Sequence, residues 1–410
     1  MISSPANNNW RAVTLLAACL AVLPILGAGS DARADLAFQG QVLDYQTKQI
    51  YHSPASPGYT AWTGLWKLPN GAIQCDFVQA TGSQSNPTFT YPLLQSTNSG
   101  KTWTNIGNDN GYNRGMAILP NGTTMVRADH SGMYFDTTGH LNWSPTFMGV
   151  QYSTNGGVTW SSSTNLVSPN DYQLCLPLNI KPLSDGRLVA MAGLVAKGVT
   201  PVLPNIQKAM FIGTFSGNQL TWGAPIPLMT TAQGICEESD FVELPNGNLF
   251  FMNRLQHYDA NGNYVSQSRS QSYVTKVGNT FAPQTPTVPF SGGQGYPCEL
   301  LTSEGILLDL CYQGSHWSND YGQTWHNLMV GGQQLNTYYY PQAVQAADGT
   351  IVVTGHYSMD DAYGAVDESI HVQTFRLSAD PLPEPSTLTL LGIGAFGLLV
   401  YAWRRRKHGV

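Results

Sequence analysis

Charged side chains are scarce in this chain of 410 residues, where Asp, Glu, Lys and Arg together make up 11 %. The formal net charge is -6, and no basic stripe runs along the middle of the chain. Because nucleic-acid binding needs a clustered positive surface, that class of function is excluded. The chain is rich instead in glycine (42), tyrosine (20) and tryptophan (10), a profile typical of turn-rich, neutral-polar β structure. The composition therefore favours an all-β protein.

Cysteine is also sparse, and none of the six residues occurs in the C-x-x-C or Cys/His spacing of a zinc site. The sequence has no EF-hand loop or dense carboxylate cluster either, so we expect neither a metal ion nor a cofactor. Two disulfides are conceivable in an oxidising compartment, Cys175 with Cys236 or Cys298 with Cys311, beside inert core thiols.

The N-terminus has the features of a secretory signal. Arg11 precedes an apolar run over residues 12–27, and Ala32-Arg33-Ala34 fits the small-x-small rule for signal peptidase. The run is shorter than a comfortable membrane span. We therefore predict a signal helix within residues 1–34, removed after Ala34.

The C-terminus carries a second targeting segment. Residues 388–403 are apolar, four cationic residues follow at 404–407, and Pro383-Glu384-Pro385 precedes them. Cationic residues after an apolar span stay cytoplasmic, so we expect a transmembrane helix with the rest of the chain outside. The whole segment resembles the PEP-CTERM sorting signal of Gram-negative bacteria. The resemblance implies removal of residues 381–410 by an exosortase, a transient membrane anchor, and delivery to the cell surface or extracellular matrix.

Six similar turns mark the middle of the chain as a repeat. They are LPNG at 68–71 and 119–122, LSDG at 183–186, LPNG at 244–247, TSEG at 302–305 and AADG at 346–349. Asn-Gly and Asp-Gly favour tight hairpins, and alternating apolar residues flank these turns. Units of this length suit four-stranded blades, so residues 35–380 are predicted to form a six-bladed β-propeller. Residues 36–45 are expected to complete the last blade, which removes an exposed edge.

A second repeat lies between these hairpins. The pattern S-x-D/N-x-G-x-T-W occurs at 96–103, 153–160 and 318–325, with a degenerate copy at 216–222. An Asx side chain caps such a turn, and the tryptophan packs between sheets. These segments resemble the Asp-box (BNR) repeats of sialidases, where they join the outer strands of a propeller blade. The resemblance supports a sialidase-like propeller and gives the boxes a structural role.

Residues at one offset from each hairpin glycine should form a ring around the propeller axis. Nine residues before the glycine the repeats have Trp62, Asn113, Pro177, Glu238, Tyr296 and Tyr340. Seven residues after it they have Val78, Asp129, Gly193, Arg254, Tyr312 and His356. Ionisable and aromatic residues concentrate at these offsets in a chain with little charge, which predicts a functional mouth.

The sialidase resemblance extends to particular residues of this ring. Residues 238–254 are similar to the family segment whose first Glu serves the nucleophile and whose last Arg holds the sugar carboxylate, which implies these roles for Glu238 and Arg254. Tyr340 resembles the family's nucleophilic tyrosine. Two family arginines and the acid/base aspartate have no counterpart at 61, 311–317 or near 85. Arg114 and Asp129 are the candidates to supply the missing cation and acid.

The predicted function is therefore an exported glycoside hydrolase of sialidase type that acts on an extracellular glycan or exopolysaccharide. Tyr340, Glu238 and Asp129 are its predicted catalytic residues. The predicted substrate-binding residues are Arg254, Arg114, Asn113, Trp62, Tyr312 and His356. Two alternatives remain: a glycan-binding or matrix propeller without catalysis, and a structural protein in which Glu238 and Arg254 form a buried salt bridge that ties blades together.

Overall fold

A computed structural model describes residues 38–53, 58–143, 148–200, 205–228, 235–258, 264–290, 292–357, 362–364 and 368–377. The chain divides into two compact units, Met1–Leu377 and Ser378–Val410, and every described residue belongs to the first. The predicted signal segment at 1–34 and the sorting tail at 381–410 lie outside the described residues. Among those described, no helix has the length and apolar character needed to span a membrane.

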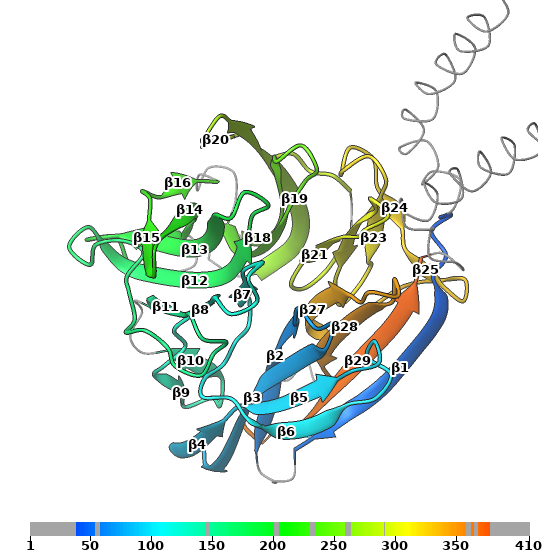
Figure 1. Ribbon diagram of the computed structural model, residues 1–410, viewed down its shortest axis with the longest axis horizontal. Coiled ribbons are helices and arrows are strands. Elements are labelled where there is room, and N and C mark those ends of the chain that lie inside the picture. The colour runs from blue at the N-terminus through cyan, green and yellow to red at the C-terminus, as the bar shows by residue number, and fades with distance from the viewer. Residues whose placement is uncertain are drawn as a thin grey trace, which may run out of the picture. The chain divides into compact units, whose positions relative to one another are not determined.

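Six of the eight antiparallel sheets among the described residues form blades around a common centre (Figure 1), and the other two are small hairpins. The first blade has β2 (Tyr59–Lys67), β3 (Ile73–Ser83), β5 (Pro92–Ser96) and β6 (Thr104–Asn108), with β4 (Asn86–Thr90) beside β3. The second has β7 (Ala117–Ile118), β8 (Met125–Ala128) and β11 (Val150–Ser153), and carries the hairpin of β9 (Met133–Phe135) and β10 (Leu141–Trp143) in its connection. The third has β12 (Tyr172–Pro182), β13 (Leu188–Ala196), β14 (Gln207–Ser216) and β15 (Gln219–Trp222), with β16 (Ile226–Pro227) beside β14.

The other three blades each have four strands. Blade four has β17 (Ile235–Glu243), β18 (Leu249–Tyr258), β19 (Tyr264–Val277) and β20 (Thr280–Pro283). Blade five has β21 (Cys298–Leu301), β22 (Leu307–Leu310), β23 (His316–Ser318) and β24 (His326–Asn327), followed by the small hairpin of β25 (Met329–Val330) and β26 (Gln333–Gln334). Blade six has β27 (Tyr339–Gln345), β28 (Ile351–His356), β29 (Ser369–Arg376) and β1 (Leu43–His52). The six-bladed propeller predicted from the repeats is thus confirmed.

The six glycine turns join the first two strands of every blade, as predicted. In each turn the glycine amide donates to the carbonyl three residues earlier, at 2.8 to 3.1 Å, for example Gly247 to Leu244. All six glycines have φ between 71° and 85°, a backbone conformation that other residues rarely adopt. The turn residues therefore set the start of each blade's second strand.

The three S-x-D/N-x-G-x-T-W segments also share one turn geometry. In the third copy, the Gly322 amide donates to Ser318 Oγ at 2.8 Å and the Thr324 amide donates to Asp320 Oδ1 at 2.8 Å. The copies that begin at Ser96 and Ser153 repeat both bonds. These side chains close the turns with their own hydrogen bonds, which is a structural task.

The N-terminal segment closes the last blade, but not with the predicted residues. The pairing strand is β1, Leu43–His52, which runs antiparallel to β29, whereas residues 36–45 were expected. Earlier residues of the segment are part of the hydrophobic core instead, because Phe38 and Val42 are buried in one cluster with Trp317 and Leu328. The approach to the strand holds buried apolar residues, whereas the exposed outer strand itself is mostly polar.

Both disulfides considered from the sequence are contradicted, because Cys175, Cys298 and Cys311 are buried free thiols. Cys298 lies opposite Leu310 in the ladder, and both pack in the core that blade five shares with blade six. Cys311 follows Leu310, so the alternation of side chains directs it to the other face. Cys175 packs in the core between blades two and three.

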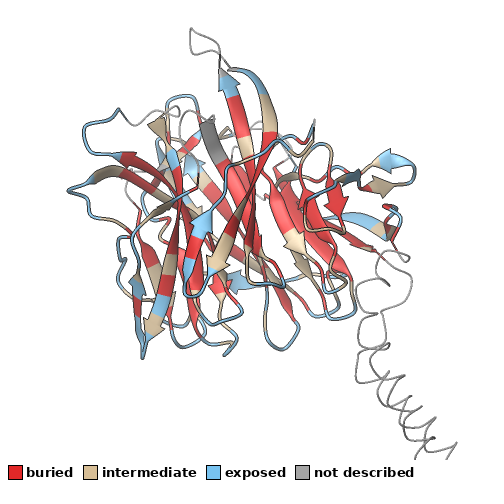
Figure 2. Cartoon of the chain, turned by 90° about the horizontal axis from the view of Figure 1, so that it is seen from above, coloured by how far each residue is buried: buried red, intermediate tan, exposed pale blue. Residues whose placement is uncertain are grey.

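The buried residues form separate apolar clusters between neighbouring blades. One cluster joins Val189 and Met191 of blade three to Phe241 and Phe251 of blade four. Figure 2 shows buried segments along the strands and exposed segments at the connections. The first strands of adjacent blades lie side by side, for example β2 with β27 and β17 with β21. Their first residues therefore meet at one end of the axis, called the mouth below.

Candidate functional site at the mouth of the propeller

The inner strands are irregular at the offset predicted to line the mouth. The ladder between the first two strands is interrupted between Ala61 and Thr63, and again between Tyr339 and Gln342. Each bulge holds a non-glycine residue in left-handed backbone, Trp62 with φ 58° and Tyr340 with φ 50°. Such residues cost of order 1–3 kcal/mol each and persist where the surroundings over-determine them, often at functional sites.

The bulges bring together aromatic rings from three strands and from the connection that precedes β21. The Tyr340 ring centroid lies 5.7 Å from that of Trp62, 5.8 Å from that of Tyr296 and 5.6 Å from that of His356. Tyr340 is half-buried, whereas the other three are buried. Tyr340 therefore presents its ring at the open side of a packed aromatic group.

His356 holds this group in place. Its Nδ1 accepts a hydrogen bond from the backbone amide of Trp62 at 3.2 Å, which ties blade six to blade one at the bulge. Burial, helped by the positive charge of Arg114, lowers the pKa of His356 to about 3. The imidazole is therefore neutral near pH 7, as an acceptor must be, and it positions Trp62 rather than transferring protons.

Arg114 lies against the same rings. Its guanidinium carbon is 4.0 Å from the Tyr296 ring centroid and 4.7 Å from the Tyr340 ring centroid, both suitable for cation–π contact. Burial works against its charge, but Tyr296, Tyr112, Tyr340 and Glu238 raise the pKa of Arg114 above its usual value. Its buried Nη2 has no hydrogen-bond partner. The mouth thus contains a permanent positive charge.

Glu238 and Arg254 lie next to each other on adjacent strands of blade four. They are direct partners in the ladder of β17 and β18, and Arg254 Nη1 lies 2.7 Å from Glu238 Oε2. Gln267 Oε1 accepts from Arg254 Nε at 2.7 Å and fixes the guanidinium further. The salt bridge considered from the sequence exists, but it lies within blade four and does not tie two blades together.

Asn113 is placed in a buried network rather than in the aromatic group. Its Nδ2 donates to Asp76 Oδ2 at 3.0 Å, and its Oδ1 accepts from Arg127 Nη1 at 2.8 Å. Burial and the nearby charge of Asp109 raise the pKa of Asp76 to about 8. These contacts join blade one to blade two through Asn113.

The remaining predicted residues lie at the ends of the second strands. Asp129 is half-buried, and its Oδ1 accepts from the Ser131 amide at 3.0 Å. Despite partial burial, hydrogen bonds from Ser131 and Ser163 lower the pKa of Asp129, so the carboxylate is ionised. The Tyr312 ring stacks on Tyr339 with centroids 3.8 Å apart, and Tyr339 lies 5.8 Å from His356.

Sequence reasoning missed Tyr339 and Asp76 as members of this region. Tyr339 precedes a bulge, so the fixed offset from the hairpin glycine selected its neighbour Tyr340. Asp76 lies five residues after its glycine, which is neither of the two offsets that predict the mouth. A carboxylate between two apolar strand residues, Cys75 and Phe77, was the available signal for a buried polar contact.

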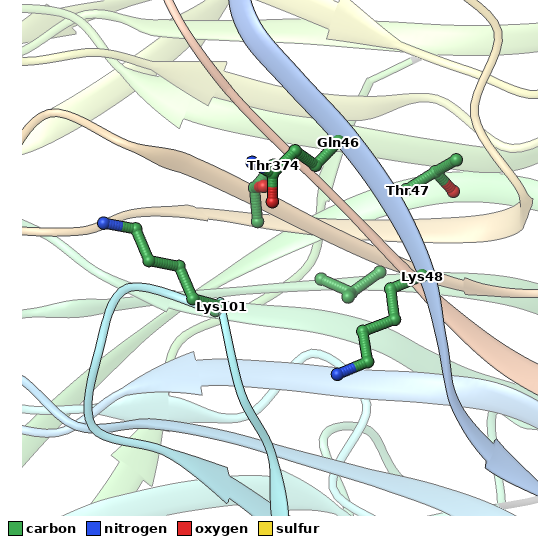
Figure 3. A pocket seen from close by; sticks show the side chains of 7 residues that line it. Gln46, Thr47, Lys48, Lys101 and Thr374 are labelled. Atoms are coloured by element: carbon green, nitrogen blue, oxygen red, sulfur yellow. The ribbon is translucent and has the colours of Figure 1, made fainter.

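Two further hollows lie away from the mouth residues. Residues from all six blades line a cavity of about 220 Å³ on the axis, where Lys181 Nζ lies 2.7 Å from Asp240 Oδ1. A second hollow of about 330 Å³ lies between β1 and the turn after β5, where Figure 3 shows the side chains of Lys48 and Lys101. Neither contains a residue that the sequence predicted for the site.

The sequence has one recognisable family segment. Residues 381–407 match the PEP-CTERM protein-sorting motif. This motif indicates export and sorting to the cell envelope or surface. No curated protein matches the sequence.

Solved structures resemble the fold at low sequence identity. A GH93 α-L-arabinofuranosidase of Fusarium graminearum, solved with arabinobiose, is 14% identical with a TM-score of 0.58, over 81% of this chain and 97% of that one. An α-L-arabinanase of Penicillium chrysogenum, also with arabinobiose, is 16% identical with a TM-score of 0.57, over 81% and 98%. The intramolecular trans-sialidase of Ruminococcus gnavus, with oseltamivir carboxylate, is 13% identical with a TM-score of 0.52, over 81% and 98%. The chain therefore has the propeller fold found in these glycoside-processing proteins.

Proposed function

We propose that the protein is an exported glycoside hydrolase that acts on an extracellular polysaccharide through the mouth of its propeller. The observation that carries this proposal is the position of the Tyr340 ring, 4.7 Å from the Arg114 guanidinium carbon and on left-handed backbone. A cation beside a phenol favours the phenolate, which is the nucleophilic form. The similar folds of an arabinofuranosidase and a trans-sialidase support the same class of substrate.

In the first chemical step, the Tyr340 hydroxyl oxygen attacks the anomeric carbon of the sugar while the bond to the leaving oxygen breaks. Glu238 accepts the phenol proton, and the leaving oxygen takes a proton from water at the open mouth. In the second step, water attacks the same carbon and releases Tyr340. Asp129, which is ionised, accepts the proton of that water and passes it to the hydroxide left by the first step, and Glu238 returns its proton to the phenolate. Asp129, which was expected from the sequence to supply the acid, is thus proposed instead as a base in this step, because its carboxylate is ionised.

Arg254 and Arg114 are proposed to orient the sugar, and Trp62 to pack on its apolar face. Arg254 is held by Glu238 and Gln267, so its direction is fixed before substrate arrives. Processing is proposed to involve signal peptidase at the N-terminus and an exosortase at the sorting motif, with a transient membrane anchor between the two events.

A second candidate is a glycan-binding propeller that does not hydrolyse its ligand. The 2.7 Å contact of Glu238 with Arg254 favours it, because the arginine occupies a carboxylate oxygen that would have to accept the phenol proton. The two candidates differ in turnover. Incubation of the full chain with a panel of arabinan, pectin, alginate and sialylated glycans should release sugar, and Tyr340→Phe should abolish the release. Binding without release by the wild-type protein would favour the second candidate.

A further inference from the structure

A group of aromatic side chains outside the mouth lies on one face of blade six. Tyr338, Tyr357 and His371 form it, with ring centroids 4.4 Å apart for Tyr338 and His371, and 5.3 Å for Tyr357 and His371. Tyr357 is 51% exposed, and the other two are half-buried. We call these three residues the aromatic shelf.

The shelf continues the face that blade six turns toward blade five. Ile351 and Val353 of β28 are buried in the core that includes Leu308 and Leu310 of blade five. Side chains alternate along a strand, so Gly355 and Tyr357 lie on that same face. His371 is the partner of Gly355 in the ladder with β29. The shelf therefore lies where this face reaches the mouth end of the propeller.

Two of the three side chains of the shelf, Tyr338 and His371, are held in place before any ligand binds. A side chain at Gly355 would come within 2.8 Å of Tyr338 Cβ and 2.7 Å of the Tyr339 carbonyl oxygen, so the glycine makes room for Tyr338 to lie over the strand. The Tyr338 hydroxyl is 2.8 Å from Thr47 Oγ1, and Ser369 Oγ is 3.0 Å from His371 Nε2. Rings that are already immobilised lose little entropy on binding.

The surface that these rings present is aromatic and uncharged near pH 7. Burial lowers the pKa of His371, so its imidazole is neutral there. Flat aromatic surfaces with polar edges suit the alternating C–H faces and hydroxyl groups of sugars, as they suit other amphipathic partners. Charged groups that would select an anion or a cation are not part of the shelf.

The shelf is also continuous with the mouth. Tyr338 and Tyr357 are the chain neighbours of Tyr339 and His356, and the rings of those two residues lie 5.8 Å apart beside Tyr340. We infer that the aromatic shelf binds the sugars that follow the terminal sugar of a polysaccharide chain, while the terminal sugar occupies the mouth. This inference rests on the proposed function in one respect, that the mouth accepts a sugar.

Affinity electrophoresis of the full chain tests the inference, in native gels cast with arabinan, pectin, alginate or xylan. At least one polysaccharide should retard the wild-type protein, and Tyr357→Ala should raise the apparent Kd about tenfold, as expected for a lost aromatic contact. Tyr338→Phe keeps its ring and should stay within about twofold of wild type. Ile106→Ala removes a side chain of similar exposure, 48%, from β6 and should bind as wild type does.

Equal retardation of Tyr357→Ala and wild type, with unchanged melting temperatures, would overturn the shelf, as would no retardation in any gel. Loss of a dimer in sedimentation by Tyr357→Ala, without a change in retardation, would assign the shelf to a second copy of the chain and also overturn it. Retardation that depends on Tyr357 in a protein that releases no sugar would support the shelf while contradicting the hydrolase. Tyr340→Phe should keep its retardation, which separates the two sites.

Discussion

Asp76 makes the stability of the propeller depend on pH in a predictable direction. This carboxyl group is completely buried in β3, where Oδ2 accepts from the Asn113 amide at 2.8 Å and from Asn113 Nδ2 at 3.0 Å. Its other oxygen, Oδ1, has no hydrogen-bond partner. Burial and the charge of Asp109 raise the pKa to about 8 from an ordinary value of 3.8.

The sign of the effect follows from proton binding. Between about pH 4 and pH 8 the folded protein keeps the Asp76 proton and the unfolded chain has lost it, so the folded state binds more protons. Stability therefore falls as pH rises through this window, by about 1.4 kcal/mol per pH unit. From about pH 5 to about pH 8 the loss sums to about 4 kcal/mol.

Asp76→Asn removes the ionisation and keeps the size of the side chain and one acceptor oxygen. Urea unfolding at several pH values should show similar stabilities for the variant and wild type near pH 5. Near pH 8 the variant should be more stable by a few kcal/mol. Asp171→Asn, at an exposed position before β12, is the matched control and should keep the wild-type pH dependence. Parallel pH profiles for Asp76→Asn and wild type would show that Asp76 does not cause this pH dependence.

Three further changes test other parts of the structure. Ser318→Ala removes the acceptor of the Gly322 amide and the donor to Asp320 Oδ1, and urea unfolding should show a loss of about 1–2 kcal/mol. Arg114→Met places a neutral side chain against Tyr340. For the glycan that the wild-type protein hydrolyses fastest, kcat should fall at least about a hundredfold, with a smaller change in melting temperature. An unchanged kcat would remove Arg114 from the mechanism. His356→Phe removes the acceptor of the Trp62 amide, and should lower both the melting temperature and kcat, while full activity would show that the bulge needs no such bond.

The fold could be predicted because its signals are local and repeated. Each hairpin glycine needs positive φ, so the six turns are visible in sequence wherever the chain makes them. The limits of the closing strand could not be predicted, because β1 is an outer strand with mostly exposed residues and its approach carries the apolar pattern. The conformation of a turn is determined by a few consecutive residues. The pairing of a strand at the edge of a sheet depends instead on whether the other strands of the blade leave that edge unpaired.

The site was less predictable because a bulge adds a residue to a strand. The residue that faces the mouth then no longer lies at a constant number of positions before the hairpin glycine. The offset from the glycine selected Trp62, Glu238 and Tyr340, all of which lie at or beside bulges. The same offset in blade two selected Asn113, whose neighbour Arg114 is the residue that contacts the tyrosines. Buried partners such as Asp76 and Arg269 depend on contacts between blades, which no short segment contains. Arg269, for example, contacts Asp309 of blade five at 3.4 Å.

The proposed glycoside hydrolase uses Tyr340 as its nucleophile. The most direct measurement is mass spectrometry of peptides from the full chain after acid quench during turnover of the glycan that it hydrolyses. A glycosyl adduct is expected on the peptide that contains Tyr340, absent from Tyr340→Phe and accumulated in Asp129→Asn, which lacks the base of the second step. Turnover without an adduct on Tyr340, at a rate that Tyr340→Phe retains, would contradict this role of Tyr340.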